Sequence, residues 1–186
     1  KQFVFVASPT AITVFERNTS TGNLTLIGSA TGTSGFTTLA VSPDGNSLYA
    51  GGASGITRFA VSGSGGLTVA ATSQGISGIT AIAQSPSTNP SFSSDLYAIS
   101  ASNSALYLLD ASTLSMQTSL VGAQQLGLTG PLAITISPDG QSVFVASTVS
   151  SAIAVIARDT AAPLLSLAQI LQNGVDGVRA LADPNG

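Results

Sequence analysis

The sequence predicts an all-β fold, a β-propeller of about four blades with four antiparallel strands in each. The first supporting observation is a repeated motif: the nine residues Ser42–Ala50 return as Ser137–Val145. A third copy, Ser85-Pro86 followed by Asp95–Ala98, carries an insertion in its turn. Units of four short strands at a period near 47 residues are typical of propeller blades. A β-sandwich with coincidental repeats is the alternative.

The spacing of the repeats is the second observation. The aromatic residues that align between the copies are Phe5, Tyr49, Tyr97 and Phe144, at intervals of 44, 48 and 47 residues. Joining the last residue to the first gives a further interval of 47, because the two ends carry complementary halves of one repeat. We therefore interpret residues 1–186 as one propeller unit, a fragment or repeat of a larger protein. Its expected blades are 177–186 with 1–29, 36–72, 78–121 and 131–171, and the C-terminal strand of this chain or of a neighbouring copy completes the first blade.

Each element of the repeat has a physical reason. In the second unit the expected strands are 36–41, 47–51, 55–61 and 66–72. The first strand of a unit alternates small and branched apolar residues, which suits the crowded axis of a propeller. The turn after it contains Pro-Asp-Gly: proline fixes its own backbone angle, aspartate bonds nearby backbone, and glycine tolerates the left-handed region. The predicted structural turn residues are Pro43, Asp44, Gly45, Pro138, Asp139, Gly140, Pro184 and Gly186.

Composition excludes several kinds of function. The chain is 44% hydrophobic and 7% charged, which argues against disorder. Its net charge is −3 and its five Lys and Arg residues are scattered, so we expect no nucleic-acid partner. Ser, Thr, Gln and Gly interrupt the uncharged runs, so we expect no membrane span. The Ser/Thr-rich, Lys-poor composition favours an extracellular or cell-surface location.

Residues suited to catalysis or metal binding are scarce. The chain has no Cys and no His, the ligands that zinc prefers, and no Asp-x-Asp-x-Asp run suited to calcium. No two acids have the spacing of a catalytic pair. We interpret Asp95 and Asp110 as turn residues, and Arg158 and Asp159 as solvated charges at a strand end. We therefore predict no metal, no cofactor, no catalytic residue and no enzymatic activity.

One charged residue breaks the pattern of the axial strands. Arg179 aligns with small residues of the other units, and a charge there needs water, a carboxylate or a ligand. Asp176 is the nearest candidate partner, so a local salt bridge and a ligand contact at the channel mouth are both open. Gln124 and Gln125, in a loop that enters an axial strand, are further candidate ligand-binding residues.

Two short motifs match the N-glycosylation pattern. They are Asn18-Thr19-Ser20 and Asn23-Leu24-Thr25, which makes Asn18 and Asn23 candidate acceptors.

The repeat resembles a known family. Ser-Pro-Asp-Gly-x-x-Leu-Tyr-Ala (42–50), followed in its first copy by Ile12–Asn18 and Thr21–Leu26, is similar to YVTN-type, lactonase-like β-propeller repeats. The segment 173–181 resembles linkers in large bacterial surface proteins of that group. The resemblance implies a propeller fold and covers 6-phosphogluconolactonase-like hydrolases as well as non-enzymatic surface proteins. It also implies that enzymatic members use His with Arg or Glu on one face of the ring, whereas this chain has no His and a single Glu, Glu16.

These observations predict a non-catalytic extracellular scaffold, an adhesion or assembly module. It would act through protein–protein contacts or self-association, including contacts with other repeats of the same protein. Two alternatives are open: a lactonase-like hydrolase whose catalytic residues lie outside this chain, or a small-ligand binder at the channel mouth.

Overall fold

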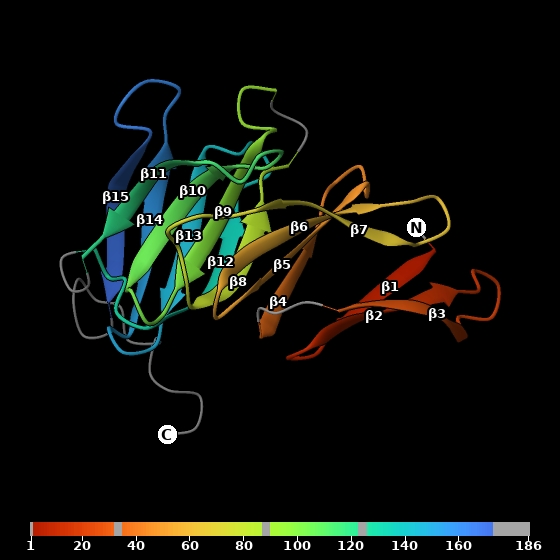
Figure 1. Cartoon of the computed structure of the whole chain (residues 1–186). Coiled ribbons are helices and arrows are strands. Elements are labelled where there is room, and N and C mark those ends of the chain that lie inside the picture. Colours follow the sequence, from red (N-terminus) through yellow and green to blue (C-terminus); the bar gives the residue numbers. More distant parts are fainter. Residues whose placement is uncertain (1, 32–34, 87–89, 123–125, 173–186) are drawn as a thin grey trace.

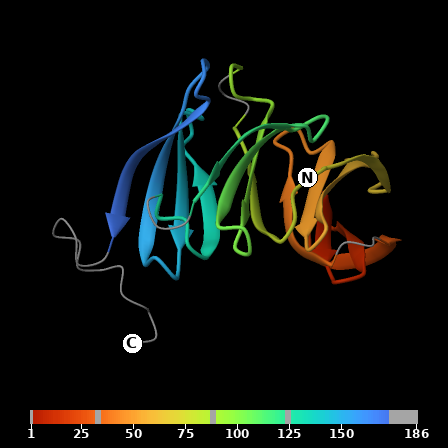
Figure 2. The same cartoon turned by 60° about the vertical axis from the view of Figure 1, so that its left-hand side comes forward.

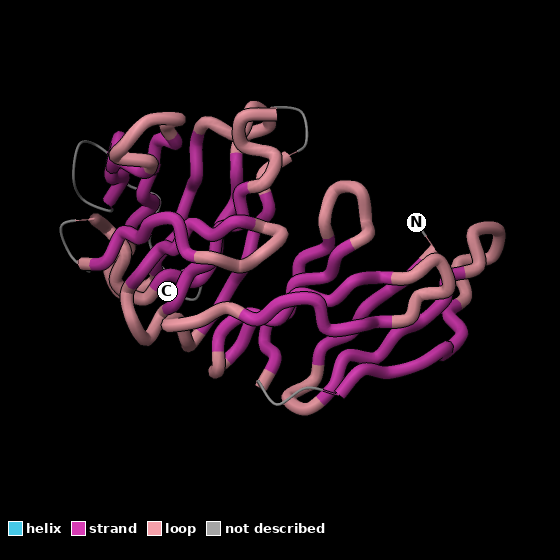
Figure 3. The backbone as a smooth tube through the Cα atoms, turned by 45° about the horizontal axis from the view of Figure 1, so that its top comes forward, coloured by secondary structure: helices cyan, strands magenta, loops and turns pink. Residues whose placement is uncertain are grey.

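The computed structural model describes residues 2–31, 35–86, 90–122 and 126–172, which form fifteen strands and no helix. Figure 3 shows these strands joined by loops and turns. No segment of the described chain is an apolar helix long enough to cross a membrane. The strands are β1 (Phe3–Ala7), β2 (Ala11–Arg17), β3 (Leu24–Thr31), β4 (Phe36–Val41), β5 (Ser47–Gly52), β6 (Gly55–Val61), β7 (Leu67–Thr72), β8 (Ile79–Gln84), β9 (Asp95–Ser100), β10 (Ala105–Asp110), β11 (Met116–Val121), β12 (Pro131–Ile136), β13 (Ser142–Ser147), β14 (Ala152–Arg158) and β15 (Leu165–Gln172).

The strands form four antiparallel sheets in chain order, which confirms the predicted all-β propeller architecture. Blade 1 is β1-β2-β3, blade 2 is β4-β5-β6-β7, blade 3 is β8-β9-β10-β11 and blade 4 is β12-β13-β14-β15. Blade 1 therefore shows three strands. The prediction that residues 177–182 add the fourth strand concerns positions outside the described residues.

A recurring irregularity links the four blades. In every blade the register between the third and fourth strands of the repeat shifts at the equivalent point, for example between Val14 and Phe15 in blade 1 and between Arg58 and Phe59 in blade 2. The same shift occurs at Leu108 and Leu109 and at Val155 and Ile156. A β-bulge at this point strengthens the twist of the outer strands.

The blades stand side by side in an arc. The first strands of blades 2, 3 and 4, which are β4, β8 and β12, lie next to one another at the inner side of the arc, and β1, which corresponds to the second strand of the repeat, lies beside β4. Figures 1 and 2 show blade 1 at one end of the arc and blade 4 at the other. Two threonine hydroxyls join successive innermost strands: Thr37 Oγ1 donates to Ile79 O at 2.9 Å, and Thr80 Oγ1 donates to Pro131 O at 3.2 Å.

The hydrophobic core lies between the blades. One cluster joins blades 1 and 2, a second joins blades 2 and 3, and a third joins blades 3 and 4. All six residues of β9 are buried, because blade 3 is covered on both faces. Gly51 shows how close blades 2 and 3 approach: a Cβ there would lie 2.7 Å from Ile79 and 2.8 Å from Ile82. Most of β3, at the outer edge of blade 1, is exposed.

Candidate functional site

The turns between the first and second strands of blades 2 and 4 share one hydrogen-bond pattern. In blade 2, Ser42 Oγ donates to Asp44 Oδ1 at 2.5 Å and accepts from Ser47 N at 2.9 Å. Gly45 has a φ of 70°, which favours glycine, and its N–H donates to Ser42 O.

Blade 4 repeats this pattern. Ser137 Oγ donates to Asp139 Oδ1, Ser142 N donates to Ser137 Oγ, and Gly140 has a φ of 75°. The bond from Ser137, aided by the Gln141 N–H, holds the pKa of Asp139 below its ordinary value. Pro43 and Pro138 occupy the equivalent position in each turn.

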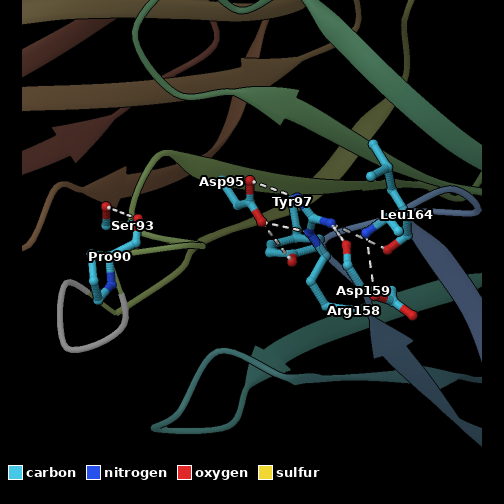
Figure 4. Close-up of polar contacts among 8 residues, drawn as sticks. Pro90, Ser93, Asp95, Tyr97, Arg158, Asp159 and Leu164 are labelled. Atoms are coloured by element: carbon cyan, nitrogen blue, oxygen red, sulfur yellow. Dashed lines mark hydrogen bonds and ion pairs between the residues drawn. The ribbon is translucent and has the colours of Figure 1, made fainter.

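Blade 3 departs from this pattern and carries a buried ion pair. Asp95 begins β9 at the position that Ser47 and Ser142 occupy in blades 2 and 4, and its side chain is 2% exposed. Arg158, at the end of β14 in blade 4, donates through Nε to Asp95 Oδ2 at 2.6 Å and through Nη2 to Asp95 Oδ1 at 3.3 Å. Figure 4 shows the two side chains meeting between the blades, with Tyr97 beside them.

The surroundings of the pair complete its hydrogen bonds. The Tyr97 hydroxyl donates to Asp95 Oδ2 at 3.3 Å. The Arg158 guanidinium lies over the Phe92 ring, 5.1 Å from the ring centroid, and Nη1 donates to Asp159 O. Burial, followed by the charge of Asp95, raises the pKa of Tyr97 well above its ordinary value of 10.0. Burial alone would lower the pKa of Arg158, but the bond to Asp95 and its negative charge outweigh that effect and raise it.

Two sequence interpretations are therefore wrong. Asp95 is not an ordinary turn residue, and Arg158 is not a solvated charge, because its side chain is only 6% exposed. The insertion before Asp95 removes the serine–aspartate turn of the other blades and brings an acid to a serine position. The sequence signal that could have revealed the ion pair is this aspartate at a position where the other copies of the repeat have serine.

A second polar site is an open cleft of about 310 Å³ between blades 2 and 3. Arg58, on β6, donates through Nε to Ser47 Oγ at 3.1 Å and through Nη1 across the cleft to Ser112 O at 2.9 Å. Tyr49 is the cross-strand neighbour of Arg58. The cleft is lined by Ser42, Pro43, Asp44, Ser47, Tyr49, Arg58, Gln84, Ser93, Ser94, Ala111 and Ser112.

Blade 1 carries a polar cleft of about 350 Å³ at its turn end, lined by Gln2, Glu16, Arg17, Asn18, Thr19, Ser20 and Thr25. Asn18 shapes the turn there, since its Oδ1 accepts from Ser20 N at 2.9 Å and from Thr21 N at 3.0 Å. Asn23 N donates to Thr21 Oγ1 in the same turn. Both candidate glycosylation residues are exposed, and their acceptor role stays a prediction.

The remaining predicted ligand-binding residues, Gln124, Gln125, Asp176 and Arg179, lie outside the described residues, as do Pro184 and Gly186. The described axial strands β4, β8 and β12 carry no Asp, Glu, Lys or Arg. No cluster of metal-ligating side chains occurs within residues 2–31, 35–86, 90–122 and 126–172. The described axial surface therefore offers threonine hydroxyls but no general acid or base.

Comparison with known proteins identifies the fold. No protein-family model matches the chain, and no curated protein matches it. Among solved structures, a candidate 6-phosphogluconolactonase from Bacteroides uniformis matches with a TM-score of 0.67 at 20% identity, over 91% of this chain and 57% of that one. The periplasmic gluconolactonase of Pseudomonas aeruginosa matches with a TM-score of 0.67 at 15% identity, over 91% and 51%. A β-propeller domain from Myceliophteria thermophila gives 0.67 at 13% identity, over 92% and 55%.

These matches show a lactonase-like β-propeller fold, and the chain spans about half the length of the structures it matches. They also correct the prediction that the chain is not an enzyme, because structures named as lactonases share its fold. The lack of a catalytic pair within four blades was insufficient ground for that prediction, since a propeller can draw its site from other blades. The YVTN-type repeat stays a resemblance without a matching family model.

Proposed function

We propose that the chain is part of a lactonase-like hydrolase, a propeller in which further blades complete the ring and supply the catalytic groups. The observation that carries the proposal is the superposition of 91% of the chain on two structures named as lactonases, each spanned over about half its length. An arc of four blades fits half of such a ring.

The uncovered face of blade 1 supports further blades beside it. Phe5 and Ala7 pack toward blade 2, so the alternating residue Val6 faces the other way and is 49% exposed. Leu26 of β3 is 62% exposed. A sheet face that carries such side chains is covered by the next blade in a closed propeller.

The reaction sets clear chemical requirements. Water attacks the lactone carbonyl carbon, the bond from that carbon to the ring oxygen breaks, and the ring oxygen gains a proton to give a hydroxy acid. A general base must take a proton from the water, and a cation or hydrogen-bond donors must stabilise the oxyanion. The described axial strands β4, β8 and β12 supply Thr37 and Thr80 hydroxyls that already bind neighbouring backbone. In this proposal, these blades therefore form the wall of the site and the remaining blades supply the base.

The test compares the whole natural protein that contains this chain with the 186-residue chain alone. The ring opening of 6-phosphogluconolactone and of gluconolactone is followed by acid release and compared with the spontaneous rate. We expect acceleration by the whole protein and none by the chain alone. No acceleration by the folded whole protein would overturn the hydrolase, while acceleration by the chain alone would overturn the assignment of the catalytic groups to other blades.

The extracellular location stays a prediction. The association with further repeats of the same protein also stays a prediction, and it is part of this proposal, since those repeats would complete the ring.

A further inference from the structure

Arg58 occupies a position that is apolar in every other blade. The aromatic residue of the repeat pairs across the strands with Val14 in blade 1, Leu108 in blade 3 and Val155 in blade 4. In blade 2 the corresponding pair is Tyr49 and Arg58. The repeat fold forms without an arginine here, so folding alone does not require one.

Arg58 lies within hydrogen-bond reach of the Tyr49 hydroxyl, and its two bonds to other residues leave the Nη2 end of the guanidinium. Nε binds Ser47 Oγ and Nη1 binds Ser112 O, and neither bond uses Nη2. These two bonds hold the planar group at the border of the cleft between blades 2 and 3. A guanidinium fixed in this way presents parallel N–H donors, the geometry that carboxylate and phosphate oxygens match.

Arg58 is the one cation and Asp44 the one acid among the described residues that line the cleft, so the anion preference depends on the bonds that already occupy the carboxylate. Burial raises the pKa of the Tyr49 hydroxyl, and the positive charge of Arg58 opposes that rise more strongly than the negative charge of Asp44 adds to it. The Asp44 carboxylate accepts bonds from Ser42 Oγ, Asn46 N and Asn46 Nδ2. Asp110, near the far wall, accepts bonds from Ser112 and Thr113. Both acids in the vicinity are thus engaged by neighbouring donors.

Gln84 is the second unusual group in the cleft. Its Oε1 is buried and has no hydrogen-bond partner among the described residues. An unbonded buried oxygen costs free energy, so such a group is rarely left without a use. This oxygen can accept a hydrogen bond from a ligand hydroxyl or N–H that reaches it.

We propose that this cleft binds a small hydroxylated molecule that carries an oxyanion, a carboxylate or a phosphate, as sugar acids and sugar phosphates do. The Arg58 guanidinium binds the anionic oxygens, and the Tyr49 hydroxyl and the Gln84 amide bind neighbouring hydroxyls. The volume of about 310 Å³ lies at the lower end of small-molecule sites, about 300–1,000 Å³. The site lies between two blades of this chain, so it does not depend on ring completion or on the proposed hydrolase.

The test measures binding to the 186-residue chain by calorimetry and by NMR of the backbone amides. The probes are gluconate, 6-phosphogluconate, inorganic phosphate and the uncharged polyol sorbitol. We expect the two hydroxylated anions to bind, with shifts at Ser94 and Ser112, and sorbitol not to bind. A preference between gluconate and 6-phosphogluconate identifies the anionic group.

Variants locate the site. Losing a charge-assisted hydrogen bond is worth about 1.5–3 kcal/mol, so Arg58→Leu is expected to weaken binding by about 10-fold to 150-fold. Arg17→Leu, which removes an exposed arginine of blade 1, is the matched control and should leave binding unchanged. Gln84→Ala should weaken binding less than Arg58→Leu. If the leucine variant does not fold, Arg58→Lys takes its place, because it keeps the charge but removes the planar guanidinium. Absence of anion binding to the folded chain, equal binding of sorbitol, or binding that persists in folded Arg58→Leu or falls equally in Arg17→Leu would overturn the proposal.

Discussion

Blade 3 lies between two arginines, one reaching it from each neighbouring blade, and the two are used differently. Arg158 of blade 4 is closed off: its side chain is 6% exposed and pairs with Asp95. Arg58 of blade 2 is partly buried at the border of a cleft, where it binds the Ser47 hydroxyl and the Ser112 carbonyl. Arginine thus makes a buried ion pair at the junction of blades 3 and 4 and solvent-accessible hydrogen bonds at the junction of blades 2 and 3.

Both arginine contacts depart from the pattern of the repeat. At the junction between blades 1 and 2, the positions equivalent to Asp95 and Arg158 hold the apolar residues Phe3 and Val61. The junction between blades 3 and 4 thus has charges at positions that are apolar there. A buried ion pair adds little net stability over apolar side chains of similar volume, but removing one partner leaves a buried charge without compensation. The open arginine carries no such penalty, because solvent reaches it.

Breaking the ion pair between Asp95 and Arg158 should lower the stability of the chain more than any other change considered. Asp95→Ala leaves the Arg158 guanidinium buried without its carboxylate, so the free energy of unfolding should fall by about 3–5 kcal/mol. The measurement is urea unfolding of the variant and of the natural chain at neutral pH.

Replacing both partners provides the control for that prediction. In the double variant Asp95→Leu with Arg158→Leu, neither charge is left unpaired, so most of the lost stability should return. A double variant as unstable as Asp95→Ala would show that packing of the new side chains, and not the unpaired charge, dominates the junction.

The second prediction concerns alkaline pH and compares Tyr97 with Tyr49. Burial raises the pKa of both hydroxyls, and Asp95 raises that of Tyr97 further, while Arg58 opposes the rise at Tyr49. Above the ordinary value of 10.0, unfolded chains lose a proton that the folded state keeps, so stability falls as pH rises, by up to about 1.4 kcal/mol per pH unit for each such group. Tyr97→Phe should flatten this fall more than Tyr49→Phe. The measurements are the free energy of unfolding of each variant between neutral pH and pH values above 10, and the phenolate absorbance that reports tyrosine ionisation. An equal effect of the two variants would contradict the prediction.

Much of the fold is predictable because the repeat is visible in the residues. The spacing of Phe5, Tyr49, Tyr97 and Phe144 predicts successive blades, and a propeller blade has one strand order available to it. The bulge between the outer strands was not predicted, since the large apolar residues that follow it, Phe15, Phe59, Leu109 and Ile156, are equally common in regular strands. Composition and repeat spacing also do not predict the open arc of blades, because similar blades build rings of different size.

The candidate sites were predictable only in part, for a physical reason. Arg179 was singled out because it breaks a repeat position, yet the same comparison applied to Arg58 and Asp95 would have marked both. Asp95 was missed because charges near strand ends and turns are usually solvated. Arg58, in the middle of β6, was missed because the scattered arginines were considered only as a nucleic-acid signal. Whether such a charge is solvated depends on the neighbouring blade, and the partner of Asp95 lies 63 residues further along the chain.

The smallest expected effect is that of Arg58 on stability. Arg58→Val introduces the residue that blades 1 and 4 have at this position. Two hydrogen bonds are lost, but water replaces the guanidinium at the exposed residue Ser112, and blades 1 and 4 form with valine at this position. The free energy of unfolding should therefore fall by about 1 kcal/mol, far less than in Asp95→Ala. Urea unfolding of the two variants side by side gives the comparison. A loss in Arg58→Val as large as that in Asp95→Ala would mean that both arginines act as structural clamps, and that the cleft between blades 2 and 3 depends on Arg58 to hold its walls together.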